Sequence, residues 1–158
     1  MQVRDATFED CDALGVGMKV VVDEGIWLAT AAASELELAN RFRQAILEGH
    51  TLLVLEDEGG IVGSLGVHPT QAEGVSALGM WVLPSHRRRG GGRMLLEAAL
   101  AARPEEVHKI ELEVFPENGA AIALYRQLGF EKEGLRRAHY RRRDGSLRSA
   151  LIMARLFT

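Results

Sequence analysis

The stretch MWVLPSHRRRGGGRMLL, residues 80–96, decides the fold of this chain. Its first residues are apolar, as at the end of a buried strand, and Pro84 stops that strand before the apolar spacing of a helix begins at Met94. A strand that passes through a glycine turn into a helix aims free backbone N–H groups and the positive end of the helix dipole at one point. Residues 80–96 therefore predict a phosphate-binding site.

The composition of the turn favours a diphosphate. Glycines carry no Cβ that would hold a diphosphate away from the backbone, and arginines supply charge around it. The turn is not a P-loop, because no Lys-Ser or Lys-Thr follows the glycines, nor a G-x-G-x-x-G dinucleotide motif, because Leu95 takes the last glycine position. A flexible basic loop before a surface helix is the alternative. The turn consists of Arg87, Arg88, Arg89, Gly90, Gly91, Gly92 and Arg93.

Outside this turn, apolar periodicity and turn residues predict a mixed α/β (α+β) chain with an antiparallel start and crossover helices later. Caps are expected at Thr7 and at Ser34, and Asp144-Gly145 is a strong hairpin signal. We expect one domain over residues 1–158. Strands are expected at 1–6, 51–55, 61–67, 75–83, 110–114, 136–143 and 147–156, and helices at about 7–24, 36–47, 94–100 and 118–128.

Composition bounds the class of protein. Of the 158 residues 47% are hydrophobic and 26% charged, which is typical of a soluble folded domain. The net charge of -3 and the few aromatics among the arginines of residues 136–143 argue against nucleic-acid binding. No leader or membrane-spanning run is expected. Cys11 is the only cysteine, so no internal disulfide forms, and we expect a cytoplasmic protein. The scattered histidines predict no metal site.

Two motifs resemble the GNAT superfamily of acetyltransferases. The first is Arg87-x-x-Gly90-x-Gly92 directly after the strand that ends at Pro84, and the second is the segment 113–130, with Glu113-Val114-x-x-x-Asn118 and then Ala121-Ile122-x-Leu124-Tyr125-x-x-x-Gly129-Phe130. The resemblance implies a GNAT fold, with a central mixed, mostly antiparallel sheet of about seven strands, flanked by about four helices and splayed at an acetyl-CoA groove. It implies an N-acetyltransferase with acetyl-CoA as donor.

The resemblance also implies roles for particular residues. The backbone of Met80, Trp81 and Val82 would pair with the pantetheine arm, and the turn 87–93 would hold the pyrophosphate. Tyr125 would be the general acid for the departing thiolate, and Asn118, about two turns earlier, would hydrogen-bond the pantetheine or the thiol.

Proton removal from the amine falls to Glu113 in this scheme. It matches the position of the proton acceptor in the ribosomal-protein alanine acetyltransferases, and Glu111, on the same strand face, could replace it. A chain of water molecules is an alternative proton acceptor. A second alternative is that the two carboxylates are solvent-facing residues without a catalytic role.

The acceptor is the least determined part. A primary amine of a small molecule, of the amino-acid or polyamine type, is the first expectation, and an N-terminal protein or peptide amine is the second. Glu24 and Trp27 are expected near the acceptor. A CoA-binding regulatory module without turnover is the alternative of another class, and a homodimer is left open beside a monomer. The chain departs from the family at Gly91, where an apolar residue is common, and in having no glutamate on the strand 75–82.

Overall fold

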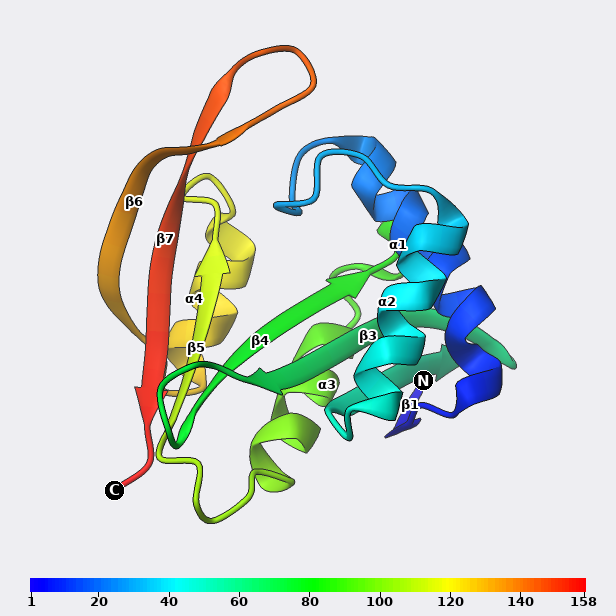
Figure 1. Ribbon diagram of the computed structural model, residues 1–158, viewed down its shortest axis with the longest axis horizontal. Helices are drawn as coiled ribbons and strands as arrows, with labels where there is room; N and C mark the ends of the chain where they lie inside the picture. The colour runs from blue at the N-terminus through cyan, green and yellow to red at the C-terminus, as the bar shows by residue number, and fades with distance from the viewer.

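The computed structural model describes all residues 1–158 and contains one seven-stranded sheet with four α-helices, as the resemblance predicts (Figure 1). No helix is long and apolar enough to cross a membrane. In chain order the elements are β1 (Gln2–Asp5), α1 (Cys11–Glu24), α2 (Glu35–Leu47), β2 (Thr51–Asp57), β3 (Gly60–Pro69), β4 (Val75–Val82), α3 (Gly91–Ala101), β5 (Lys109–Val114), α4 (Gly119–Gln127), β6 (Glu131–Arg141) and β7 (Leu147–Leu156).

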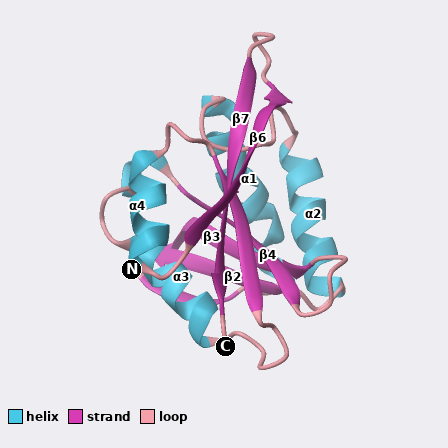
Figure 2. Cartoon of the chain, turned by 90° about the vertical axis from the view of Figure 1, so that its left-hand side faces the viewer, coloured by secondary structure: helices cyan, strands magenta, loops and turns pink.

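The sheet has the strand order β1-β2-β3-β4-β5-β7-β6. Neighbouring strands are antiparallel except β4 and β5, which are joined by the crossover helix α3 and run parallel. Helices α1 and α2 cover one face, and α3 and α4 cover the other (Figure 2). The sheet therefore has two halves, β1–β4 and β5-β7-β6, that meet at β4 and β5.

Each face of the sheet has its own core, which is why β2 reads as a continuous apolar run. Leu53 and Leu55 pack toward α3 in the larger cluster, whereas Leu52 and Val54 join the smaller cluster under α1. Trp81 of β4 belongs to this smaller cluster.

Two local predictions needed correction. Thr7 caps a short 3-10 turn over residues 8–10, where its backbone N–H donates to Asp10, and α1 starts only at Cys11. Strand β6 starts at Glu131 and not at residue 136. Its sequence is almost entirely polar because it is an edge strand whose side chains are mostly exposed, so it lacks the alternation that marks a half-buried strand.

Replacing Gly15 by alanine is expected to lower the free energy of unfolding. The new Cβ would lie 2.6 Å from the carbonyl oxygen of Glu35 and 2.9 Å from the backbone nitrogen of Ala39, so α1 and α2 would have to separate. Overpacking costs about 1–3 kcal/mol, which at a backbone clash outweighs the roughly 1 kcal/mol that alanine gains over glycine in a helix. Urea unfolding measures the difference. The control is Gly119→Ala, whose Cβ meets nothing within 4 Å; equal midpoints for the two variants would contradict the prediction.

Candidate active site

The site is built on the parting of β4 and β5. The two strands pair only from Val75/Lys109 to Ala77/Glu111, and beyond that point they diverge (Figure 1). Each strand stays bonded to its outer neighbour, β4 to β3 and β5 to β7, so the two halves of the sheet twist apart. The edge of β4 that faces β5 is thus left without a ladder from residue 78 onward, and another extended chain can pair with it.

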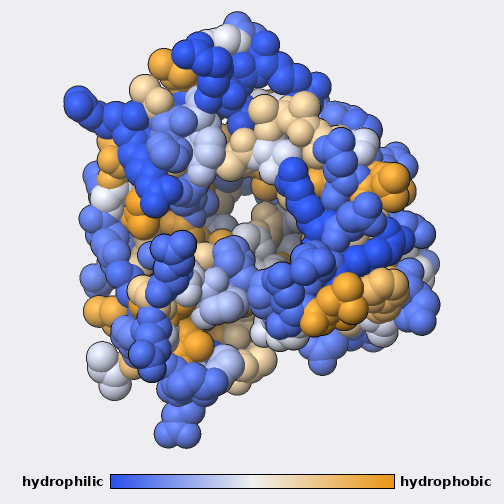
Figure 3. All heavy atoms as spheres, viewed as in Figure 1, coloured by the Kyte–Doolittle hydropathy of each residue, from blue (hydrophilic) through white to orange (hydrophobic).

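A groove of about 1300 Å³ fills this parting. The space-filling view from the side of α1 and α2 shows a hollow near the centre of the molecule (Figure 3). Most of the residues expected at the site line the groove, whereas Glu24 and Arg89 do not. The expected residues that line it are Trp27, Met80, Trp81, Val82, Arg87, Arg88, Gly90, Gly91, Gly92, Arg93, Glu111, Glu113, Asn118 and Tyr125.

One end of the groove is the glycine turn before α3. Gly90 has φ of +85°, which a residue with a Cβ adopts only under strain, and it ends the turn as the N-cap of α3 without a side-chain cap. None of the backbone N–H groups of residues 88–93 donates a hydrogen bond within the chain. This row of free donors at a helix N-terminus fits a diphosphate.

The structure divides the four arginines of the turn. Arg87 does not point freely into the groove: it donates to both carboxylate oxygens of Glu24, at 2.9 and 2.6 Å, and to the carbonyl oxygen of Val82 at 3.0 Å. Glu24 therefore ties the end of α1 to the turn. Arg89 lies 3.6 Å from Asp57, and Arg93 bonds Glu97 and Gln127 on the helix side.

Arg88 differs from these three arginines. It has φ of +60° and makes no side-chain hydrogen bond or ion pair, although it lines the groove. It is the arginine that is free to meet a phosphate.

The unusual Gly91 has a packing reason. A Cβ at this position would lie 2.5 Å from Cδ2 of Leu55, so the leucine side chain of β2 fills the volume that an apolar residue would need. The start of α3 is thereby buried against the sheet and not loosened. A Cβ at Gly92 would meet only ordinary contacts, 3.5 Å from Met80 and Leu124.

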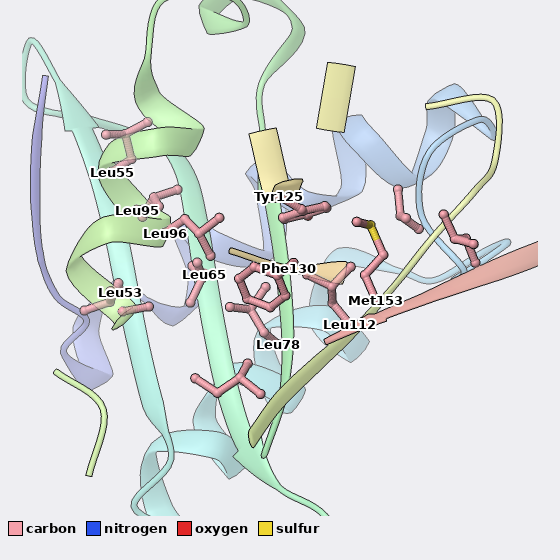
Figure 4. Close-up of a cluster of buried hydrophobic side chains, with 14 of the residues drawn as sticks. Leu53, Leu55, Leu65, Leu78, Leu95, Leu96, Leu112, Tyr125, Phe130 and Met153 are labelled. Atoms are coloured by element: carbon pink, nitrogen blue, oxygen red, sulfur yellow. The ribbon is translucent and has the colours of Figure 1, made fainter. Parts of the chain in front are cut away.

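Tyr125 reaches the groove from the core beneath α4. Its ring packs 5.8 Å from that of Phe130, and the close-up shows the two rings together beside Leu112 and Met153 (Figure 4). Burial raises the pKa of Tyr125 to about 12, and no protein group hydrogen-bonds its hydroxyl. The phenol therefore keeps its proton at neutral pH.

Asn118 is the N-cap of α4. Its side-chain oxygen accepts a hydrogen bond from the backbone nitrogen of Ala121 at 3.3 Å, so the cap orients the side chain. The amide NH₂ group stays available as a donor at the groove.

The two carboxylates of β5 have different surroundings. Glu113 is held by the guanidinium of Arg136 and the hydroxyl of Tyr140, both on β6. Burial and this carboxylate raise the pKa of Tyr140 to about 12, so the phenol remains a donor. Glu111 is half-buried and makes no hydrogen bond or ion pair.

Sequence reasoning missed a contact beside the groove, on the side of α1. The turn between β6 and β7 bonds the loop 25–34: Arg142 donates to the carbonyl oxygen of Ala29 at 3.1 Å, and Arg143 to that of Ala31 at 2.6 Å. Arg142 is buried, with its guanidinium 5.3 Å from the ring of Phe115, and desolvation lowers its pKa. The basic run was visible in the sequence, but its partners are carbonyl groups more than 100 residues away, which no local pattern marks.

A split sheet with an anion-ready turn at one end and titratable groups along its walls defines a class, that of proteins which bind an extended, phosphate-bearing donor between two strands. The sequence profile of the acetyltransferase (GNAT) family matches residues 22–130. The chain belongs to this family, and the resemblance inferred from the two motifs is confirmed.

Named relatives are similar to parts of the chain. It is 43% identical over 81 residues to the N-alpha-acetyltransferase RimI of Mycobacterium tuberculosis, and 43% identical over 72 residues to the ribosomal protein bS18 alanine N-acetyltransferase of Escherichia coli. These matches cover 51% and 45% of the chain and 48% of each relative, so the chain spans about half the length of the curated relatives it matches.

Solved structures are similar over nearly the whole chain. The ribosomal-protein-alanine N-acetyltransferase of Brucella melitensis has a TM-score of 0.88 and 26% identity, with coverage of 99% of this chain and 100% of that one. A phosphinothricin acetyltransferase of Sinorhizobium meliloti, solved in complex with acetyl-CoA, has a TM-score of 0.85 at 23% identity, with coverage of 99% and 88%. The second likeness is one of fold.

Arg88→Gln is expected to weaken the binding of coenzyme A. A free guanidinium beside the unbonded amides would form a charge-assisted hydrogen bond, worth about 1.5–3 kcal/mol, so Kd should rise roughly 10- to 100-fold. Calorimetric titration at two ionic strengths measures this, and the loss should shrink at high salt. Arg89→Gln is the control, because Arg89 faces Asp57 outside the groove. An equal loss in both variants would mean that only the total charge of the turn matters.

Proposed function

We propose that this protein is a single-domain N-acetyltransferase that moves acetyl from acetyl-CoA directly to a primary amine. The observation that carries the proposal is the parting of β4 and β5 after Ala77/Glu111, which leads from the unbonded amides of residues 88–93 to the phenol of Tyr125. An extended donor with a diphosphate at one end and a thioester at the other fits this groove.

The residues that would hold the donor line the same groove. The turn of residues 88–93 would receive the pyrophosphate, the open edge of Met80 to Val82 would pair with the pantetheine, and the NH₂ group of Asn118 would bond its far end. The donor supplies the activated acetyl group. Backbone N–H groups near it would stabilise negative charge on the carbonyl oxygen as the amine attacks.

Side chains of the protein would accept and donate the protons. The acceptor arrives as an ammonium and must lose one proton before its nitrogen can attack. His68, His86 and Glu117 also line the groove, but the two carboxylates on β5, beside the parting of the strands, are Glu111 and Glu113. When the C–N bond forms and the C–S bond breaks, Tyr125 gives a proton to the leaving sulfur, and the second N–H proton replaces it. No covalent bond to the protein is needed.

Two acceptors are favoured by different observations. The α-amine of a polypeptide N-terminus is supported by the names of the relatives that are at least 26% identical. A free small amine, the first expectation from the sequence, is supported by the contacts of Arg142 and Arg143, which close the acceptor side over the loop 25–34.

An acceptor panel is the first experiment. We expect wild-type protein with acetyl-CoA to release free thiol when N-terminal peptides or small primary amines are added, and mass spectrometry to find the acetyl group on the amine. The panel compares alanine-initiated peptides, the same peptides blocked at the N-terminus, amino acids and polyamines. Tight CoA binding with no thiol release from any acceptor would identify a CoA-binding module without turnover instead.

Tyr125→Phe is expected to lower kcat by at least about 100-fold, because general acid catalysis contributes roughly 10²–10⁴. Since the pKa of Tyr125 is raised to about 12, the wild-type phenol stays protonated below that value, and the loss should be the same across pH 6–9. Steady-state kinetics measure the effect. Urea unfolding of the variant controls for packing; a Tyr125→Phe enzyme with wild-type kcat would reject the role.

A further inference from the structure

We propose that Glu111, and not Glu113, is the carboxylate that receives the acceptor ammonium and takes its proton. The proposal rests on the acetyl-transfer function and assigns the proton acceptor at its site. The sequence favoured Glu113, because that position matches a family motif. The surroundings of the two side chains favour the other choice.

Glu113 already has partners. Arg136 and Tyr140 both donate to it, and these contacts bridge β5 and β6 across the intervening strand β7. An incoming ammonium would have to displace a cation and a phenol to reach the carboxylate. These bonds instead anchor the edge strand β6, whose far end leads into the turn that contacts the loop 25–34.

The side chains beside Glu111 on the neighbouring strands leave its carboxylate uncovered. It belongs to the last residue pair before β4 and β5 part, and its neighbours across the two adjacent strands are Ala77 and Ala154, whose side chains are too short to cover it. Gly79 follows on the same face of β4, and a Cβ there would meet nothing within 4 Å. A half-buried carboxylate without a partner, facing open space, is suited to bind a cation.

The position also fits the direction of the reaction. Leu78 of β4 and Leu112 of β5 belong to the larger cluster, so the alternate residues Ala77 and Glu111 point to the opposite face, which α1 and α2 cover (Figure 2). Tyr125 lies on the other face, in the cluster beneath α4. An amine that enters over Glu111 would attack at the parting of the strands, and the sulfur would leave toward Tyr125.

In this scheme the ammonium donates a hydrogen bond to Glu111 and passes one proton to it, and that proton then leaves to solvent. The neutral nitrogen forms the C–N bond as the C–S bond breaks. The nitrogen loses its second proton on forming the amide, which balances the proton that Tyr125 gives to sulfur. One proton is released overall for each acetyl group transferred from a cationic amine.

The test compares Glu111→Gln with Glu113→Gln in the full chain, using the best acceptor of the panel. For Glu111→Gln we expect kcat/KM at pH 7 to fall about 100-fold or more and to recover as pH rises toward the pKa of the free amine, about 8 for an α-amine. For Glu113→Gln we expect a smaller loss with the pH profile of the wild type. Glu105→Gln, on an exposed loop outside the groove, controls for the change of charge.

Calorimetric titration with coenzyme A separates a folding or donor-site defect from a base defect, since Kd should be the same in all four proteins. A larger loss and an altered pH profile in Glu113→Gln, with Glu111→Gln close to wild type, would overturn the proposal, as would wild-type behaviour of both variants. Absence of thiol release from the wild type with every amine would reject the proposed function and the role of Glu111 with it.

Discussion

The parallel ladder between β4 and β5 holds only the pairs from Val75/Lys109 to Ala77/Glu111, and the rest of the site depends on where it stops. Because β4 is fully bonded to β3, and β5 to β7, the two halves of the sheet stay intact while they separate. The separation leaves backbone groups of β4 unpaired in the middle of the protein. Such groups are costly unless a partner or water satisfies them. A donor that pairs like a strand is the natural partner for such an edge.

The glycine turn has fewer free positive charges than its four arginines suggest. Three of the four guanidiniums are engaged by side chains of the protein, and only Arg88 has no partner. The bidentate pair of Arg87 with Glu24 connects the phosphate end of the groove to the last residue of α1, just before the loop on the acceptor side. The glycine turn and the start of the loop 25–34 are thereby joined through one ion pair.

Two further sets of contacts shape the groove, and both come from the last hairpin. Arg136 and Tyr140 hold Glu113, while Arg142 and Arg143 bond carbonyl groups of the loop 25–34. Four polar side chains of the basic segment 136–143 thus have partners within the protein. What remains open in this region is Glu111, at the point where the strands part.

The sequence by itself determined the order of the elements, the turn before α3 and the family, because apolar period, glycine, proline and motif spacing are local properties. It placed Tyr125 and Asn118 on one helix for the same reason. It could not determine which charged groups are free. Glu111 and Glu113 are two positions apart on one strand, and Arg87 and Arg88 are adjacent. Glu113 nevertheless has partners on β6 and Arg87 has one at the end of α1, whereas Glu111 and Arg88 have none. Only the tertiary structure brings those partners within hydrogen-bond distance, and a charge that already has a partner does different chemistry from one that has none.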